Sequence, residues 1–152
     1  MPDSDAIYID TSVLVKWFVI EAYTQDVVEF FNQGSPLILS ELVLLELDCS
    51  LRRMERSGAI TNAYRLQTEK TLALQLQEAW FQLTPISMQV FKEAKLLIDS
   101  VAPLSLRSLD AMHLTIAKKA QIKRLATADK EMATVAQSLH FSTHYFNNSL
   151  TQ

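Results

Sequence analysis

Short apolar segments alternate with longer segments of helical periodicity along the chain. Five brief runs combine apolar and β-branched residues in lengths typical of strands. These runs are residues 7–9, 36–39, 81–84, 123–127 and 141–146. Between them, apolar residues recur at the three- and four-residue spacing of amphipathic helices. The predicted helices begin at Thr11 or Ser12 and continue to Phe18, and then cover residues 23–32, 41–57, 61–79, 87–98, 105–120 and 129–139.

Residues that favour helix ends stand at several of these boundaries. Ser40, Ser87 and Asp129 each precede a periodic segment and can cap it. Gly34 and Gly58 follow two of the segments, where glycine commonly ends a helix. Strands that alternate with helices predict an α/β fold with a parallel sheet covered on both faces. Right-handed crossovers would bring the carboxyl ends of the strands to one edge.

The composition is that of a folded domain, and we expect residues 1–152 to form a single one. Hydrophobic residues make up 49% of the chain, with two glycines and four prolines. No apolar run approaches the ~20 residues that span a bilayer, and the N-terminus lacks the basic and apolar regions of a signal peptide. We therefore expect no membrane association. Cys49, the single cysteine, lies in an apolar helical pattern and is expected to be a buried thiol in a reducing cytoplasm.

The charge balance limits one class of function. Fourteen basic and seventeen acidic residues give a net charge of −3, which argues against binding nucleic acid through general electrostatic attraction. Nucleic-acid chemistry is still compatible with this balance, because acids gathered to hold a metal ion would themselves lower the net charge. Any basic surface for such a substrate must be local.

Four acids stand where the predicted sheet could collect them. Asp10 and Asp129 directly follow strands, whereas Glu46 and Asp110 lie near the starts of helices. Each also has a simpler interpretation: a helix N-cap for Asp10 and Asp129, a first-turn acid for Asp110, and the margin of an apolar stripe for Glu46. Unit charges ~4 Å apart interact by ~4 kcal/mol near a protein surface. Four carboxylates at one edge would therefore require protons or cations.

The chemistry of these side chains indicates which metal ion they would bind. Carboxylate oxygens without a histidine or thiolate cluster favour Mg²⁺ or Mn²⁺ over zinc. Such an ion activates water and stabilises the in-line transition state of phosphoryl transfer. The pattern of acids therefore favours metal-dependent hydrolysis of a phosphate ester.

The segments around these acids carry a family resemblance. IYIDTSVLVK at residues 7–16, SELVLLEL at 40–47, LRSLDAMHL at 106–114 and TADK at 127–130 resemble, in order and spacing, the four motif blocks of the PIN domain. The chain is most similar to the VapC-like toxin ribonucleases of prokaryotic type II toxin–antitoxin pairs, over about its whole length. Each block alone is a weak signal, and the ordered set is a strong one.

The resemblance implies a three-layer α/β/α sandwich and Mg²⁺- or Mn²⁺-dependent endonucleolytic cleavage of RNA. It also implies homodimerisation and inhibition by a cognate antitoxin protein. By the same resemblance, the metal-binding and catalytic acids are Asp10, Glu46, Asp110 and Asp129. Ser12 and Thr127 match the small hydroxyl residues that support the acids or a metal-bound water.

Residues outside the four acids also suggest functional or structural roles. Arg107, just before a motif helix, is the preferred contact to an RNA substrate, although exposed arginines are often only solvated. His113 is expected to pack and hydrogen-bond in the core. We expect an antitoxin segment to bind an apolar groove among the early helices, at aromatics such as Trp17, Phe18, Phe30 or Trp80.

Two other functions compete with the nuclease. A PIN-fold binding module with little catalysis would have no reason to keep four mutually repelling acids. A phosphatase of the haloacid-dehalogenase type, with Asp10 as nucleophile, needs a second acid two residues later, where this chain has Ser12.

Overall fold

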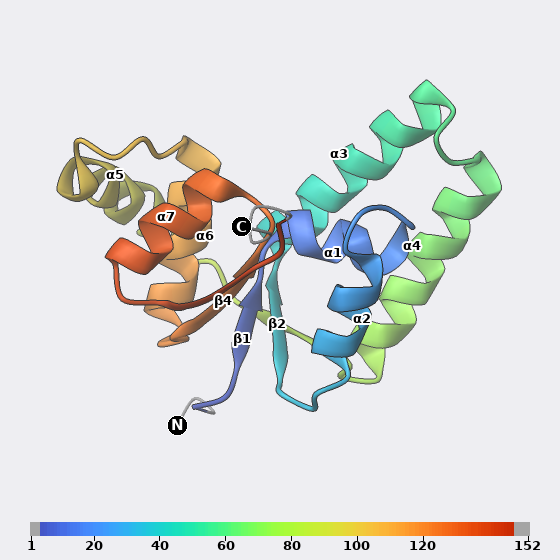
Figure 1. Ribbon diagram of the computed structural model, residues 1–152, viewed down its shortest axis with the longest axis horizontal. Coiled ribbons are helices and arrows are strands. Elements are labelled where there is room, and N and C mark those ends of the chain that lie inside the picture. Colours follow the sequence, from blue (N-terminus) through green and yellow to red (C-terminus); the bar gives the residue numbers. More distant parts are fainter. Residues whose placement is uncertain (1–3, 148–152) are drawn as a thin grey trace.

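The strands form one parallel sheet. The computed structural model describes residues 4–147, and Figure 1 shows its arrangement. The sheet has the order β3-β2-β1-β4-β5, and every neighbouring pair is parallel. Its strands are β1 (Ile7–Ile9), β2 (Leu37–Ser40), β3 (Phe81–Thr84), β4 (Arg124–Thr127) and β5 (Ser142–Tyr145).

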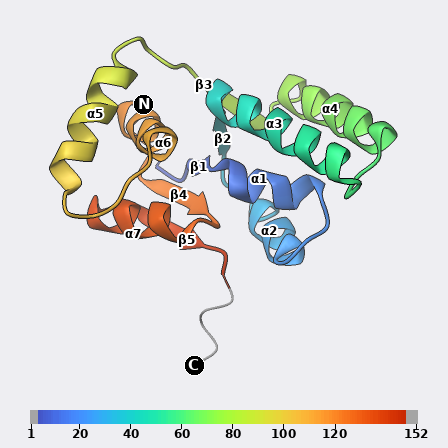
Figure 2. The ribbon, with the colours of Figure 1, turned by 90° about the horizontal axis from the view of Figure 1, so that it is seen from above.

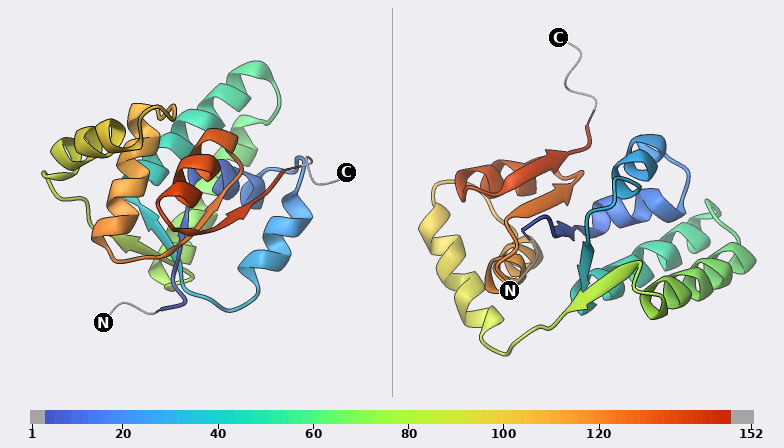
Figure 3. Two further views of the ribbon diagram at one scale, coloured as in Figure 1. Left: turned by 60° about the vertical axis from the view of Figure 1, so that its left-hand side comes forward. Right: turned by 90° about the horizontal axis from the view of Figure 1, so that it is seen from below.

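Helices cover both faces of the sheet. They are α1 (Thr11–Phe18), α2 (Thr24–Phe31), α3 (Glu41–Ser57), α4 (Asn62–Gln77), α5 (Val90–Val101), α6 (Ser108–Lys119) and α7 (Lys130–Ser138). Seen from above, α1 to α4 lie on one side of the sheet and α5 to α7 on the other (Figure 2), and the views in Figure 3 agree. The expected three-layer α/β/α sandwich is confirmed.

The strand order reverses beside the central strand β1. The chain runs outward from β1 to β2 and β3, then crosses the sheet to β4 and continues outward to β5. Consequently α1 leaves the end of β1 toward one face, and α7 leaves the end of β4 toward the other. Such a reversal opens a crevice at the carboxyl ends of the two strands, which is where open α/β sheets bind ligands. Asp10 and Asp129 follow these two strand ends.

The core lies around the central strands. Tyr8, Ile9, Leu39 and Leu125 are fully buried. Strands covered on both faces are expected to be continuously apolar, and β1 and β2 fit that rule. Within residues 4–147, no helix has the length and apolar content needed to cross a bilayer.

Most helix boundaries lie close to the predicted ones, but α5 and α6 each begin three residues later than predicted. Ser40 and Asp129 cap α3 and α7 through their side chains, as predicted. Helix α1 begins at Thr11, and Asp10 takes its capping position by accepting a hydrogen bond from the Thr11 amide. Ser87 does not cap α5 as predicted, because its hydroxyl makes no hydrogen bond and the helix begins at Val90.

The hairpin of α3 and α4 differs from the predicted apolar packing. Arg65 and Thr68 of α4 are buried, although the sequence suggested an inward face of larger apolar residues. Arg65 pairs with Glu55 of α3 and with Glu69 one turn further along α4. The hairpin is therefore fixed in part by ion pairs.

We expect Ser40→Ala to destabilise the fold by about 2 kcal/mol. The Ser40 hydroxyl is fully buried, caps α3 at the Val43 amide and contacts the Tyr8 hydroxyl at 2.8 Å. Thr61→Ala is the control, because Thr61 caps α4 at an exposed site and should cost about 1 kcal/mol or less. Urea titrations of both variants measure the difference. Equal losses would show that the buried contact to Tyr8 adds nothing to the cap.

Candidate functional site

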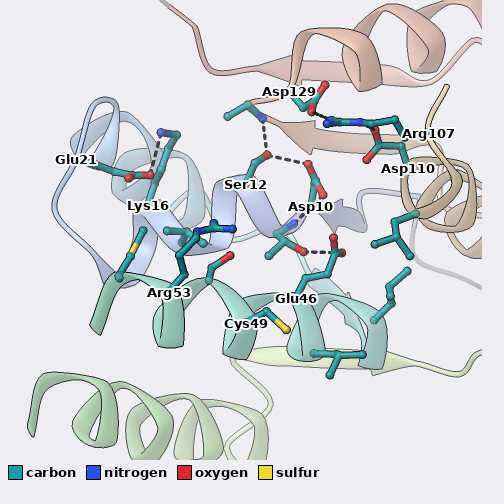
Figure 4. Close-up of a pocket in the computed structure, with 18 of the residues that line it drawn as sticks. Asp10, Ser12, Lys16, Glu21, Glu46, Cys49, Arg53, Arg107, Asp110 and Asp129 are labelled. Carbon is teal, nitrogen blue, oxygen red and sulfur yellow. Dashed lines mark hydrogen bonds and ion pairs between the residues drawn. The ribbon is translucent and has the colours of Figure 1, made fainter. Parts of the chain in front are cut away.

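All four predicted acids line one groove. It has a volume of about 830 Å³ and lies between α1 and α3, continuing to the starts of α6 and α7. Asp10 follows β1, Glu46 lies on α3, Asp110 lies in the first turn of α6 and Asp129 follows β4. Figure 4 shows these side chains around a common space. The groove coincides with the crevice at the reversal of the strand order.

Asp10 is held by three donors. It is buried, and one carboxylate oxygen accepts the Thr11 amide at 2.8 Å. The other oxygen accepts the hydroxyls of Ser12, at 2.7 Å, and Thr127, at 2.8 Å. The N-cap interpretation of Asp10 is therefore correct, but it accounts for only one of the two oxygens. The second oxygen is oriented by two side chains from different elements.

Ser12 and Thr127 also connect the two loops of the crevice. The Ser12 hydroxyl accepts the amide of Ala128 at 2.9 Å, and the Thr127 hydroxyl accepts the amide of Asp129 at 3.0 Å. Each hydroxyl thus donates to Asp10 and accepts from the loop after β4. This arrangement fixes the segment that carries Asp129 relative to Asp10.

Glu46 is half-buried and belongs to a chain of hydrogen bonds that enters the core. It accepts the Thr11 hydroxyl at 3.1 Å and pairs with Nε2 of His113. Nδ1 of His113 lies 2.7 Å from the Tyr8 hydroxyl, which in turn contacts Ser40. Because both hydroxyls can reverse their donor direction, the chain is satisfied with His113 neutral or charged.

The Glu46–His113 pair is favoured in its charged form. Partial burial alone would raise the pKa of Glu46, but the hydrogen bond and positive charge of His113 outweigh it and lower that pKa. Burial alone would lower the pKa of His113, but Glu46 and the nearby Asp10 raise it above the usual range. Nε2 of His113 lies 3.9 Å from Asp10, so the two carboxylates share one imidazole.

Asp110 and Asp129 share one arginine. The Arg107 guanidinium donates to Asp110 at 3.2 Å, to Asp129, and lies 3.7 Å from Glu131. Desolvation raises the pKa of Asp110, as does the neighbouring charge of Asp129, and Arg107 offsets only part of this. Asp129 also caps α7 at the Met132 amide, so the interpretation as an N-cap is correct here too.

Arg107, the expected contact to an RNA substrate, lines the groove. Its side chain is 64% exposed and pairs with the acids in this structure. Among residues 4–147, no three Asp, Glu, His or Cys side chains are close enough together to hold a metal ion as they stand. The guanidinium lies between Asp110 and Asp129, and Asp10 and Glu46 are directed to their own hydrogen-bond donors (Figure 4).

Sequence reasoning missed the part that His113 and Tyr8 take in the site. His113 is buried and hydrogen-bonded, as predicted. However, its partner is one of the four acids, and the spacing of Asp110 and His113 by three residues on one helix was the available signal. Cys49 was predicted to be buried and is exposed. It lines the groove because the apolar stripe of α3 is narrower than the sequence suggested.

The chain is similar to proteins of known family and structure. A family model described as the PIN domain matches residues 7–138. No curated protein sequence matches the chain. Similar solved structures include Mycobacterium tuberculosis VapC20, described as a sarcin-ricin loop cleaving toxin, with 15% identity, a TM-score of 0.66, and coverage of 84% of this chain and 93% of that chain.

Two further structures show the same fold. FitAcB from Neisseria gonorrhoeae has 16% identity and a TM-score of 0.65, with coverage of 93% of this chain and 96% of that chain. VapBC2 from Rickettsia felis, bound to a DNA fragment from their promoter, has 14% identity and a TM-score of 0.65, with coverage of 93% and 99%. At these identities the likeness establishes the architecture.

We expect His113→Gln to flatten the dependence of stability on pH. Folded His113 keeps a proton above its usual pKa of 6.5, which the unfolded chain releases, so wild-type stability falls as the pH rises through the folded-state value. The contribution of Glu46 has the opposite sign: it is present above the usual pKa of 4.5 and is lost as the pH falls through the lowered one. The pair therefore stabilises most between pH 4.5 and 6.5.

Urea titrations from pH ~5.5 to ~8.5 test this expectation. The free energy of unfolding should decline less steeply above pH 6.5 in His113→Gln than in wild type. His140→Asn is the control, because His140 is exposed, and asparagine tolerates its positive φ of 67°. Parallel pH profiles for wild type and His113→Gln would contradict the charged pair.

Proposed function

The chain belongs to the PIN domain family, and on this premise we propose that it is a Mg²⁺- or Mn²⁺-dependent endoribonuclease, the toxin of a toxin–antitoxin pair. The observation that carries the proposal is the groove in which Asp10, Glu46, Asp110 and Asp129 converge from four separate elements. Arg107 and His113 offset part of the repulsion among these carboxylates, and a bound divalent cation would offset more of it, which fits a metal-dependent reaction.

The donor set fits a hard divalent cation. Carboxylate oxygens, with hydroxyls beside them and a single exposed thiol, match the preference of Mg²⁺ and Mn²⁺ for oxygen ligands. We propose Asp10, Glu46, Asp110 and Asp129 as the residues that would hold the ion. Such a cation, when bound, would lower the pKa of a water molecule and neutralise charge on a phosphodiester in its transition state.

The supporting residues have separate roles in this proposal. Ser12 and Thr127 fix the orientation of Asp10, and His113 fixes that of Glu46. Arg107 supplies a positive charge to Asp110 and Asp129 in the metal-free protein. Were Asp110 and Asp129 to hold a cation instead, the Arg107 guanidinium would be free to contact an RNA phosphate at the groove.

An antitoxin protein and a second copy of the chain are the proposed partners. The family resemblance suggests an antitoxin and a homodimer, and RNA as substrate suggests action in the cytoplasm. The aromatic residues expected to receive an antitoxin segment are largely used within the fold. Phe30 is buried, and Trp17 stacks on Trp80 with ring centroids 6.0 Å apart. Trp80, 39% exposed, is the one of these side chains best placed to meet a partner.

A PIN-fold binding module with little catalysis is the alternative. It would bind a partner or RNA without requiring the acids as a set. Replacement of the acids therefore separates the two functions.

We expect Asp10→Asn and Asp110→Asn each to lower RNA cleavage by about 10²-fold or more, because each removes a negative oxygen from the proposed metal site. Cleavage should require Mg²⁺ or Mn²⁺ and stop in EDTA. Asp99→Asn is the matched control, because Asp99 is an exposed acid of α5 paired only with Lys95. Gel assays on labelled RNA measure the rates. Cleavage that persists in EDTA would refute the metal mechanism, and absence of cleavage by wild type would favour the binding module.

We expect Arg107→Gln to raise the affinity for Mn²⁺ by about fivefold, corresponding to the ~1 kcal/mol of an exposed ion pair that no longer has to break. Titration calorimetry with Mn²⁺ and no RNA measures this. Lys130→Gln is the control, because it removes the same charge beside Asp129 and makes no ion pair with the acids. The same gain in both variants would mean that general charge, and not the Arg107 pairs, sets the affinity.

A further inference from the structure

The groove continues well beyond the four acids. One face of α3 lines it for about three turns, through residues spaced by three and four positions: Leu42, Leu45, Glu46, Cys49, Ser50, Arg53 and Met54. At 1.5 Å per residue, Leu42 and Arg53 lie about 16 Å apart along the helix axis. A metal ion and one phosphate do not require a groove of this length.

The charge changes sign along this face of α3. Glu46 stands at the end near the other acids, and Arg53 stands two turns further on. Figure 4 shows Arg53 directed from α3 across the groove toward α1. Between the two charged residues the wall is uncharged and consists of the exposed Cys49 and of Ser50. An extended polyanion could therefore begin at the acids and continue to a positive charge.

Arg53 differs from the other basic residues of the groove. Lys16 pairs with Glu21 at 3.1 Å, and Arg107 pairs with the acids. Among the lining residues, all of which the structure describes, Arg53 is the basic side chain without an ion pair or hydrogen bond. By contrast, the adjacent Arg52 lies outside the groove and pairs with Asp48 at 3.6 Å. An unpaired guanidinium in a groove is available for an anion, and its planar fork fits phosphate oxygens.

We propose that Arg53 binds a phosphate of the RNA strand that flanks the scissile phosphate. This inference rests on the proposed nuclease function and adds a subsite to it. Arg53 follows Glu46 by seven residues, about 10 Å along α3. That rise is longer than a single phosphate group spans, so we assign Arg53 to a phosphate next to the scissile one. Cys49 and Ser50 form the wall along which the intervening nucleotide lies.

The subsite also fits the overall charge of the protein. A chain with a net charge of −3 cannot attract RNA through a general positive field. Affinity must then come from a few local contacts, and a single free arginine has more effect in such a protein than in a basic one.

The first experiment measures binding without cleavage. A labelled RNA octanucleotide is titrated in EDTA, by fluorescence anisotropy, with wild type, Arg53→Ala, Arg53→Lys and Arg52→Ala. Arg53→Ala should lose roughly tenfold in affinity, and the slope of log affinity against log salt should become shallower by about 0.7. Arg53→Lys should keep the slope and recover part of the affinity. Arg52→Ala removes the same charge from the adjacent residue and should leave both quantities near wild type.

The second experiment tests that the phosphate is a flanking one. In Mn²⁺, cleavage of an octanucleotide by Arg53→Ala should show a raised KM and an unchanged kcat. A dinucleotide, which carries only the scissile phosphate, should be cleaved equally by wild type and variant. An equal defect on both substrates would place Arg53 at the scissile phosphate and overturn the proposal.

Binding measurements with other ligands identify the group that Arg53 contacts. Arg53→Ala should lower the affinity for a deoxyoctanucleotide of the same sequence by the same factor as for RNA, because both strands carry the same phosphates. A loss of affinity confined to RNA would indicate a ribose contact instead. Hexaglutamate should bind wild type and Arg53→Ala with the same affinity. If Arg53→Ala lost as much affinity for hexaglutamate as for RNA, the subsite would be one for an acidic peptide. Unchanged RNA affinity in Arg53→Ala refutes the subsite alone, whereas wild type that cleaves no RNA refutes the proposed function.

Discussion

The site depends on how the carboxylate of Asp10 is held at the ends of β1 and β4. These strands are neighbours in space, but their helices leave toward opposite faces, so the backbone itself leaves a gap between them. Asp10, through the hydroxyls of Ser12 and Thr127, closes that gap with hydrogen bonds. One carboxylate thus follows a strand, begins a helix and fixes the neighbouring loop, which carries Asp129.

Much of this architecture could be predicted because it depends on local chemistry. The apolar residues of β1 and the caps at Ser40 and Asp129 are determined by neighbours in the sequence, and the structure has them as predicted. The parallel sheet follows from alternation of strands and helices, since topology then leaves few arrangements. The start of α5 was misplaced because a serine in a turn and a serine at a cap look the same from sequence.

Long-range pairings could not be predicted in the same way. Arg107 is close to Asp110 in sequence, but its contact with Asp129 depends on α6 and α7 meeting at the groove. Likewise, the contact of His113 with Glu46 joins α6 to α3 through two residues that are 67 positions apart in the sequence. The burial of Arg65 in α4 depends on acids that only the hairpin brings together. Periodicity reports which face of a helix is apolar, and it does not report which charge will stand opposite.

The pairing of Arg107 with the acids also bears on how the newly made chain acquires its structure. In small domains whose metal ligands are otherwise unpaired, the energy of metal binding is part of the energy of folding, and chelation unfolds them. Here the chain supplies a counterion from its own sequence to two of the acids, and His113 neutralises a third. If the acids hold a metal ion as proposed, the protein would fold before that ion binds, and removal of the ion would leave the fold intact.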